Sequence, residues 1–396
     1  MEIAPAPIRV LHCPDLVGGQ PYQLAKAERA IGLKSQCVAL QPHPFGYPAD
    51  RVLSSGGEAA LQLARWRLLA MALRHYDVIH FNFGQSAMPQ RLPLDAASKR
   101  NLPSWTRRLY NLYAAPLELA DLRLLKLNGK SIVMTYQGDD ARQGDFLRAH
   151  CEIHPADEAG YYTAESDRLK RARIETVGRY ADAVFAVNPD LLHVLPARAR
   201  FMPYAHLDVA AITPPGGTTR AVPMVLHAPS HRGVKGTRFV LDAVNRLKSE
   251  GVPFEFVLVE GLSHVEAMRL YAGADLLIDQ LLVGWYGGLA VELMALGKPV
   301  VAYIRDRDLH FIPPAMRAEL PVVNATPDSI TRVLRELLTV RRHELGELGM
   351  RSRRYAEVWH DPARIASHLK STYQNLINQS HGGRAAETAT VRQDFA

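Results

Sequence analysis

Residues 224–259 read MVLHAPSHRGVKGTRFVLDAVNRLKSEGVPFEFVLV. The apolar run Met224–Ala228 is typical of a buried strand, and Phe254–Val259 is a second run of the same kind. Between them, Thr237–Glu250 has the apolar spacing of a helix that ends near Gly251. A strand, a helix and a second strand in this order predict a parallel βαβ unit.

The same alternation runs through the rest of the chain. Further strands are predicted at residues 8–13, 35–40, 78–83, 132–136, 183–187, 276–279, 299–303 and 322–323. Further helices are predicted at residues 21–32, 58–74, 164–180, 289–296, 329–340 and 364–377. This pattern predicts an α/β fold with two doubly wound parallel sheets, and the default ligand site of such a pair is a cleft between them.

A break in composition separates the two halves. Residues 213–223 contain Pro-Pro-Gly-Gly-Thr-Thr, which is typical of a linker. We therefore expect one domain over residues 1–213 and a second over 214–357. Residues 381–396 have no apolar period, which predicts a disordered tail.

Composition narrows the class of protein. Of 396 residues, 47% are apolar and 22% are charged, as in a folded globular protein. The formal charge of +7 is not gathered into one block, so it suits a phosphorylated substrate or an anionic surface and does not favour nucleic acid. Three scattered cysteines favour a reducing cytoplasm, and we expect no signal peptide and no membrane span.

One loop carries two cations. Arg232 and Lys235 lie between a predicted strand and the helix that begins near Thr237. A helix N-terminus and two cations suit a pyrophosphate, although a solvated basic loop would have the same composition.

A second loop is rich in glycine. Gly287 and Gly288 open a predicted helix, where backbone N–H groups can approach a phosphate closely. Glu292 lies one turn further on among apolar residues, and a carboxylate there needs a partner. Ribose hydroxyls would serve, and so would an ion pair or a capping role.

These motifs resemble the donor-binding domain of GT-B glycosyltransferases, in particular the retaining family 4, which uses nucleotide sugars. The matching positions in the second half are Arg232, Lys235, Gly236, Gly287, Gly288, Glu292, Met294, Ala295, Gly297, Pro299 and Val300. In the first half, residues 78–84 (VIHFNFG), 135–140 (TYQGDD) and 181–188 (ADAVFAVN) resemble family segments in the same order. The last helix, with Tyr355, Trp359 and Tyr373, resembles the family's helix that crosses back to the N-terminal domain, here residues 358–380.

The resemblance implies a GT-B fold of two Rossmann-like domains and a set of roles. It implies that Arg232 and Lys235 hold the donor diphosphate and stabilise the leaving charge, and that Glu292 binds the ribose. It implies that the amides of Gly287, Gly288 and Leu289 contact phosphate or sugar, and that Gly18 and Gly19 approach the diphosphate. It places Asn82, Gln137 and Asp140 on the acceptor or sugar side. No metal and no cofactor is expected, since the nucleotide sugar is a co-substrate.

The chain departs from the family at two positions. Gly284 stands where the family has a Glu that contacts the donor sugar, and Gln137 stands where it often has His. Glutamine hydrogen-bonds but carries no proton at neutral pH.

Other sequence features indicate a catalytic or metal site less strongly than these motifs. Asp306-Arg307-Asp308 spells the Asp-x-Asp of metal-dependent GT-A enzymes, but its place in a second α/β domain favours a solvated loop. His12 and His80 fall where they could face the cleft, or they could be structural.

Residues 100–119 combine basic and aromatic side chains at helical spacing. Such a helix could lie on an anionic bilayer, at the inner face of the cytoplasmic membrane. The alternative is a helix whose Leu and Tyr side chains pack on the first domain while its arginines face solvent.

Together these features predict a glycosyltransferase. It would move a sugar from a UDP- or GDP-linked donor to a hydroxyl of a glycan, a lipid-linked or another acceptor, with retention and without a metal, in surface glycan or glycoconjugate synthesis. A sugar-nucleotide epimerase on the same fold and a non-catalytic nucleotide-sugar-binding protein remain as alternatives.

Overall fold

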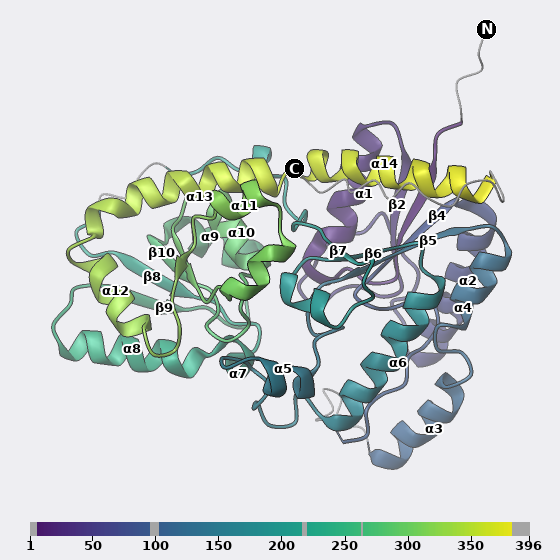
Figure 1. The fold of residues 1–396 in the computed structure, drawn as a ribbon, viewed down its shortest axis with the longest axis horizontal. Coiled ribbons are helices and arrows are strands. Elements are labelled where there is room, and N and C mark those ends of the chain that lie inside the picture. The colour runs from purple at the N-terminus through teal and green to yellow at the C-terminus, as the bar shows by residue number, and fades with distance from the viewer. Residues whose placement is uncertain (1–5, 96–102, 216–219, 263, 382–396) are drawn as a thin grey trace, which may run out of the picture. The chain divides into compact units, whose positions relative to one another are not determined.

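The computed structural model describes residues 6–95, 103–215, 220–262 and 264–381 (Figure 1). They form two compact units, each built on a parallel sheet. The described residues of the first unit lie within the ranges 1–143, 160–206 and 362–396, and those of the second lie within 144–159 and 207–361. The predicted tail lies outside the described residues, apart from its first residue, His381.

The first unit has seven parallel strands in the order β3-β2-β1-β4-β5-β6-β7. Their bounds are β1 Arg9–Cys13, β2 Lys34–Ala39, β3 Arg51–Val52, β4 Val78–Asn82, β5 Ser131–Tyr136, β6 Ala183–Ala186 and β7 Arg200–Phe201. The helices are η1 Val17–Gly19, α1 Gln20–Ala30, α2 Glu58–His75, α3 Ser104–Ala114, α4 Ala120–Leu127, α6 Ala164–Tyr180, η2 Pro189–His193 and α14 Pro362–His381.

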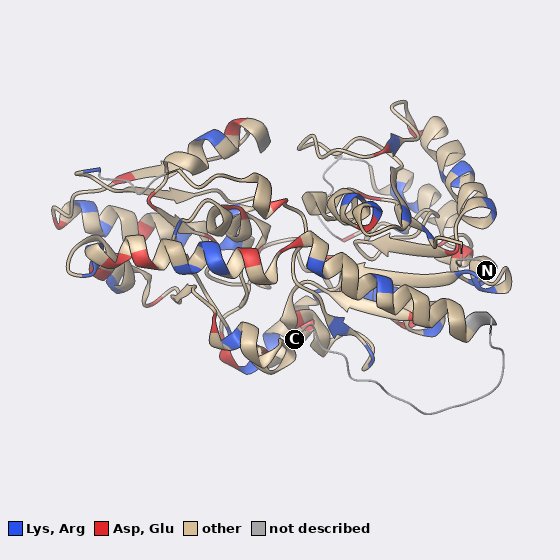
Figure 2. Ribbon diagram, turned by 90° about the horizontal axis from the view of Figure 1, so that it is seen from above, with Lys and Arg blue, Asp and Glu red and all other residues tan. Residues whose placement is uncertain are grey.

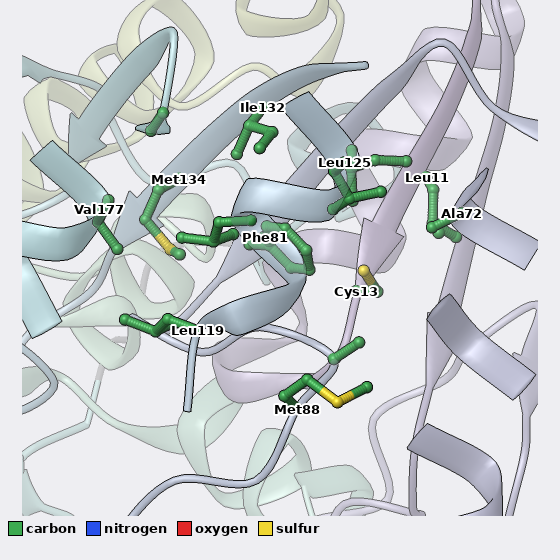
Figure 3. Packing of buried hydrophobic residues seen from close by; sticks show 14 of the residues in the cluster. Leu11, Cys13, Ala72, Phe81, Met88, Leu119, Leu125, Ile132, Met134 and Val177 are labelled. Atoms are coloured by element: carbon green, nitrogen blue, oxygen red, sulfur yellow. The ribbon is translucent and has the colours of Figure 1, made fainter. Parts of the chain in front are cut away.

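Helices cover both faces of this sheet, as the continuous apolar runs of the predicted strands require. Leu11, Phe81 and Met134 face one side, where they pack against α2, α4 and α6 (Figure 3). The alternate positions Val10 and Val133 face the other side, against α1 and α14. Because side chains alternate along a strand, a sheet buried on both faces needs the continuous apolar runs that the sequence shows.

A buried polar network attaches α14 to this sheet. The hydroxyl of Tyr373 donates to Glu28 Oε1 (3.0 Å) and lies 2.7 Å from His80 Nδ1. Glu28 also lies 3.0 Å from His12 Nε2, and neither side chain is exposed. His12 and His80 are therefore structural residues, and burial lowers the pKa of His80 well below its usual value.

The second unit has five parallel strands in the order β12-β11-β10-β8-β9. Their bounds are β8 Met224–His227, β9 Glu255–Leu258, β10 Leu276–Ile278, β11 Val300–Ala302 and β12 Val323–Asn324. The helices are α5 Gly144–His150, η3 Val209–Ala211, α7 Arg232–Lys235, α8 Thr237–Ser249, α9 His264–Gly273, α10 Gly288–Ala295, η4 Asp306–Phe311, α11 Pro314–Ala318, α12 Ile330–Leu338, η5 Arg342–Glu344 and α13 Leu345–Trp359. The core joins α8 and α12 to one face of the sheet.

Two features differ from the sequence-based expectations. Residues 144–159, expected in the first domain, belong to the second unit. The last predicted helix is divided into α13, which ends at Trp359, and α14, which begins at Pro362. Proline favours the first turn of a helix because it has no N–H to donate, which accounts for the break.

The charge is dispersed as expected, with Lys and Arg interspersed among Asp and Glu on the helices of both units (Figure 2).

Candidate functional site

The loop after β8 in the second unit forms α7 and then turns directly into α8. Gly236 makes this turn with a φ of 77°, a left-handed conformation that favours glycine. A Cβ at Gly236 would lie 3.2 Å from Leu282, and the N–H of Leu281 donates to Lys235 O (3.1 Å). The loops that follow β8 and β10 are therefore in direct contact.

Lys235 points from α7 toward the turn that precedes α10. Its ammonium donates to Gln280 Oε1 (2.5 Å) and lies 3.4 Å from Asp279 Oδ1. The other carboxylate oxygen of Asp279 accepts the N–H of Gly287 at 2.6 Å. The Asp279 side chain has no exposed surface, so this cation is held in place by a buried carboxylate beside the glycine turn.

The N-terminus of α10 lies next to this cation. Gly287 is the residue before the helix, and no side chain caps the first turn. The first amides of a helix have no partner within it, so those of Gly288 and Leu289 present the positive end of the helix dipole. Glu292 lies in the next turn and is only 5% exposed.

Arg232 has a different environment from Lys235. Its side chain is 59% exposed, and its Nε donates to Glu260 Oε1 (2.8 Å) in the loop after β9. Arg232 and Arg238 line a cavity of about 380 Å³ within the second unit. Of the two cations expected to bind diphosphate, the structure thus brings Lys235, and not Arg232, to the glycine turn.

His227 connects the elements that carry this site. Its Nε2 lies 2.9 Å from the hydroxyl of Thr237 at the start of α8, and its Nδ1 lies 2.8 Å from Ile278 O at the end of β10. Burial lowers the pKa of His227, so the ring is neutral and acts as a fixed link between the two loops.

The predicted binding residues of the first unit lie at the carboxyl ends of β1, β4 and β5. Gly18 and Gly19 both have positive φ, at 66° and 72°, and a Cβ at Gly18 would lie 3.3 Å from Gln137 Oε1. Asp140 accepts the N–H groups of Gln137 (3.0 Å) and Gly138 (2.6 Å). Loss of solvent raises the pKa of Asp140 to about 6, even though these N–H groups favour its charged form.

Polar atoms without a protein partner lie at the same strand ends. Gln137 Nε2, Asn82 Oδ1 and the hydroxyl of Tyr136 are buried and have no hydrogen bond among the described residues. Such atoms destabilise a fold unless water or a ligand satisfies them. This edge of the sheet therefore has the properties of a polar ligand site, while the acceptor or sugar-side roles of Asn82, Gln137 and Asp140 stay predictions.

Asp279 and Gln280 were not predicted as site residues, although polar residues directly after a buried parallel strand are a signal that could have identified them. The expectation of a solvated loop at 306–308 is wrong for Asp308. That side chain is fully buried and accepts from Arg305 Nη1 (3.0 Å), while Asp306 is exposed.

Several solved structures are similar to this chain along most of its length. A sucrose-phosphate synthase from Thermosynechococcus elongatus aligns with a TM-score of 0.56 at 15% identity, over 93% of this chain and 99% of that one. Anabaena HepE in complex with UDP-glucose aligns with a TM-score of 0.54 at 12% identity, over 92% and 99%. A protein from Listeria monocytogenes described as a UDP-N-acetylglucosamine 2-epimerase gives 0.50 at 12% identity, over 94% and 98%.

These likenesses show the fold, which is that of the GT-B glycosyltransferases. No family model and no curated protein matches the sequence. The predicted fold class, two parallel-sheet α/β domains, is confirmed.

Proposed function

We propose that this protein is a glycosyltransferase that transfers a sugar from a nucleotide-diphosphate donor to an acceptor hydroxyl. The observation that carries the proposal is the position of Lys235 beside Gly287, at the uncapped N-terminus of α10. A cation and unpaired helix amides are suited to a diphosphate. HepE, one of the structures with the same fold, was solved with UDP-glucose.

The proposed mechanism uses this chain's own groups to stabilise the leaving nucleotide. As the bond between the anomeric carbon and the phosphate oxygen breaks, negative charge grows on the diphosphate. The Lys235 ammonium and the amides of Gly288 and Leu289 are held in place before the reaction, so they stabilise that charge without reorganisation. Glu292 would accept hydrogen bonds from the ribose, and Arg232 would reach the diphosphate only after leaving Glu260.

The finer parts of the proposal rest on the resemblance. They are retention of configuration, a metal-independent reaction, a UDP- or GDP-linked donor, and a role in surface glycan or glycoconjugate synthesis. We also propose a cytoplasmic location, since Cys13, Cys37 and Cys151 are buried and unbridged.

The test is binding, followed by turnover. We would measure thermal shifts of wild type, Lys235→Ala and Glu292→Ala with UDP, GDP, ADP, dTDP and their sugar conjugates. Lys248→Ala, on the exposed side of α8, is the matched control. A selective shift that only the two site variants lose, followed by sugar transfer to an acceptor, is the expected result. No shift with any nucleotide would reject the proposal.

The epimerase alternative is favoured by the Listeria monocytogenes structure with the same fold. Product analysis separates the two functions, because an epimerase converts the nucleotide sugar without any acceptor. Selective binding without turnover over a broad acceptor panel would instead favour the non-catalytic binding protein. This alternative is considered because the chain departs from the family at Gly284 and Gln137.

A further inference from the structure

Helix α3 directs its apolar side chains into solvent. Trp105, Leu109 and Leu112 are 62%, 58% and 75% exposed. They occupy positions i, i+4 and i+7, so they form one stripe along one face of the helix. On a helix that packs in the ordinary way, this stripe would be the buried one.

The opposite face of α3 attaches the helix to the first unit through polar groups. The side chain of Asn111 accepts the N–H of Leu92 (2.8 Å) and donates to Leu92 O (2.8 Å), and Arg107 Nη1 donates to Pro93 O (3.0 Å). Ala114 is buried on this side. The expected alternative, with leucines packed on the domain and arginines in solvent, is therefore wrong for Leu109, Leu112 and Arg107.

Helix α2, to which α3 is hydrogen-bonded, also has exposed apolar side chains. The hydroxyl of Tyr113, at the end of α3, donates to Gln62 Oε1 (3.0 Å). The next residue of α2, Leu63, is 61% exposed, and Trp66 is 49% exposed. We call the exposed set on these two helices the apolar surface; it consists of Leu63, Trp66, Trp105, Leu109, Leu112 and Tyr113.

The charge around the apolar surface is positive. Arg67 and Arg108 are exposed beside it, and α3 contains neither Asp nor Glu. The exposed acid of the α2 first turn, Glu58, accepts a hydrogen bond from Gln62. Among the described residues, no helix is long and apolar enough to cross a bilayer.

We propose that the apolar surface docks on an anionic lipid bilayer, with α2 and α3 lying in the interface. Tryptophan and tyrosine favour the headgroup level, leucine favours the acyl boundary, and arginine pairs with lipid phosphates. A second copy of the chain fits less well, because a two-fold contact would bring two surfaces of the same positive sign together. The proposal does not depend on the glycosyltransferase function.

The test is sedimentation of the full-length protein with vesicles of phosphatidylcholine alone and of phosphatidylcholine mixed with phosphatidylglycerol. Wild type should bind the anionic vesicles more tightly. Each of Leu109→Glu and Leu112→Glu should weaken binding about tenfold or more, as expected when a leucine that is buried on binding is lost. Arg67→Gln and Arg108→Gln should each weaken binding to anionic vesicles about fivefold and leave binding to neutral ones unchanged.

The matched control is Val340→Glu in the second unit, where the side chain is 73% exposed. It introduces the same charge on an exposed apolar residue away from the apolar surface, so it should bind like wild type. Equal binding by wild type and Leu112→Glu would overturn the proposal. The proposal would also be overturned if wild type did not bind vesicles but formed a dimer in sedimentation velocity, and if Leu112→Glu dissociated that dimer. That result would assign the apolar surface to contact with a second copy of the chain.

Discussion

The guanidinium of Arg305 lies directly against the α-carbon of Gly284. A Cβ at position 284 would lie 2.8 Å from Arg305 Cζ, and Gly284 has a φ of 87°. The N–H of Arg305 donates to Gly284 O (2.9 Å), and its guanidinium is bound to Asp308 and to Ile153 O. Glycine at this position, where the family resemblance places a glutamate, is therefore required by a buried arginine.

This contact predicts that Gly284→Ala destabilises the protein more than a glycine conformation alone explains. Gly251 has a similar φ, 77°, but a Cβ there would meet nothing within 4 Å. Both substitutions should lose about 1 kcal/mol or more to the left-handed backbone, and Gly284→Ala should lose about 1–3 kcal/mol beyond that because Arg305 must move. Urea denaturation of both variants measures the difference, and equal losses would contradict the steric account.

The positions of Lys235 and Arg232 predict unequal effects on nucleotide binding. Removal of a charged hydrogen bond to a phosphate costs about 1.5–3 kcal/mol, or about ten- to a hundredfold in Kd. Lys235→Ala should show this loss, while Arg232→Ala should lose only a few-fold because its side chain is bound to Glu260 and exposed. Calorimetric titration with UDP and GDP measures both, beside Lys248→Ala, and a larger loss for Arg232→Ala would mean that the loop rearranges on binding.

Asp121 predicts a particular pH dependence of stability. It is 2% exposed, and burial raises its pKa from 3.8 to about 6, although Ser86 and Ala87 donate to it. Between these values the folded state holds a proton that the unfolded state has lost, so stability falls as pH rises through this window. The full penalty, about 3 kcal/mol, is present above about pH 6.

Asp121→Asn cannot ionise and should lack this slope. The free energy of unfolding of Asp121→Asn relative to wild type should therefore rise by about 2.5 kcal/mol between about pH 4 and about pH 7. Denaturant titrations at both pH values test this, with Asp242→Asn on the exposed side of α8 as control. A constant difference would show that Asp121 does not control the slope.

The network under α14 predicts the effect of removing one oxygen atom. Tyr373→Phe leaves Glu28 Oε1 and His80 Nδ1 without the hydroxyl that both contact. The expected loss is about 1–3 kcal/mol, because buried polar groups lose their partner while the ring volume is kept. Thermal unfolding of Tyr373→Phe beside Tyr180→Phe, a half-buried tyrosine of the same unit, measures it. Equal melting temperatures would show that the network contributes little.

The sequence by itself determined ten of the twelve strands in the described residues and their order, but not the short strands β3 and β7. The predicted strands at 224–228 and 276–279 correspond to β8 and β10, and the predicted helix at 237–250 corresponds to α8. These elements follow from local periodicity: an apolar run fits a strand buried on both faces, and spaced apolar residues fit a helix with one buried face. The glycine turn before α10 could also be identified from the sequence, because Gly287 and Gly288 stand at the start of a predicted helix.

Only the tertiary structure decided which side chains meet. It placed Lys235 with Asp279, turned Arg232 toward Glu260, assigned residues 144–159 to the second unit, and set the apolar stripe of α3 outward. Each of these depends on contacts between residues far apart in the chain. Periodicity shows that α3 has an apolar face, but the bonds from Asn111 and Arg107 to residues 92 and 93 determine which face is buried.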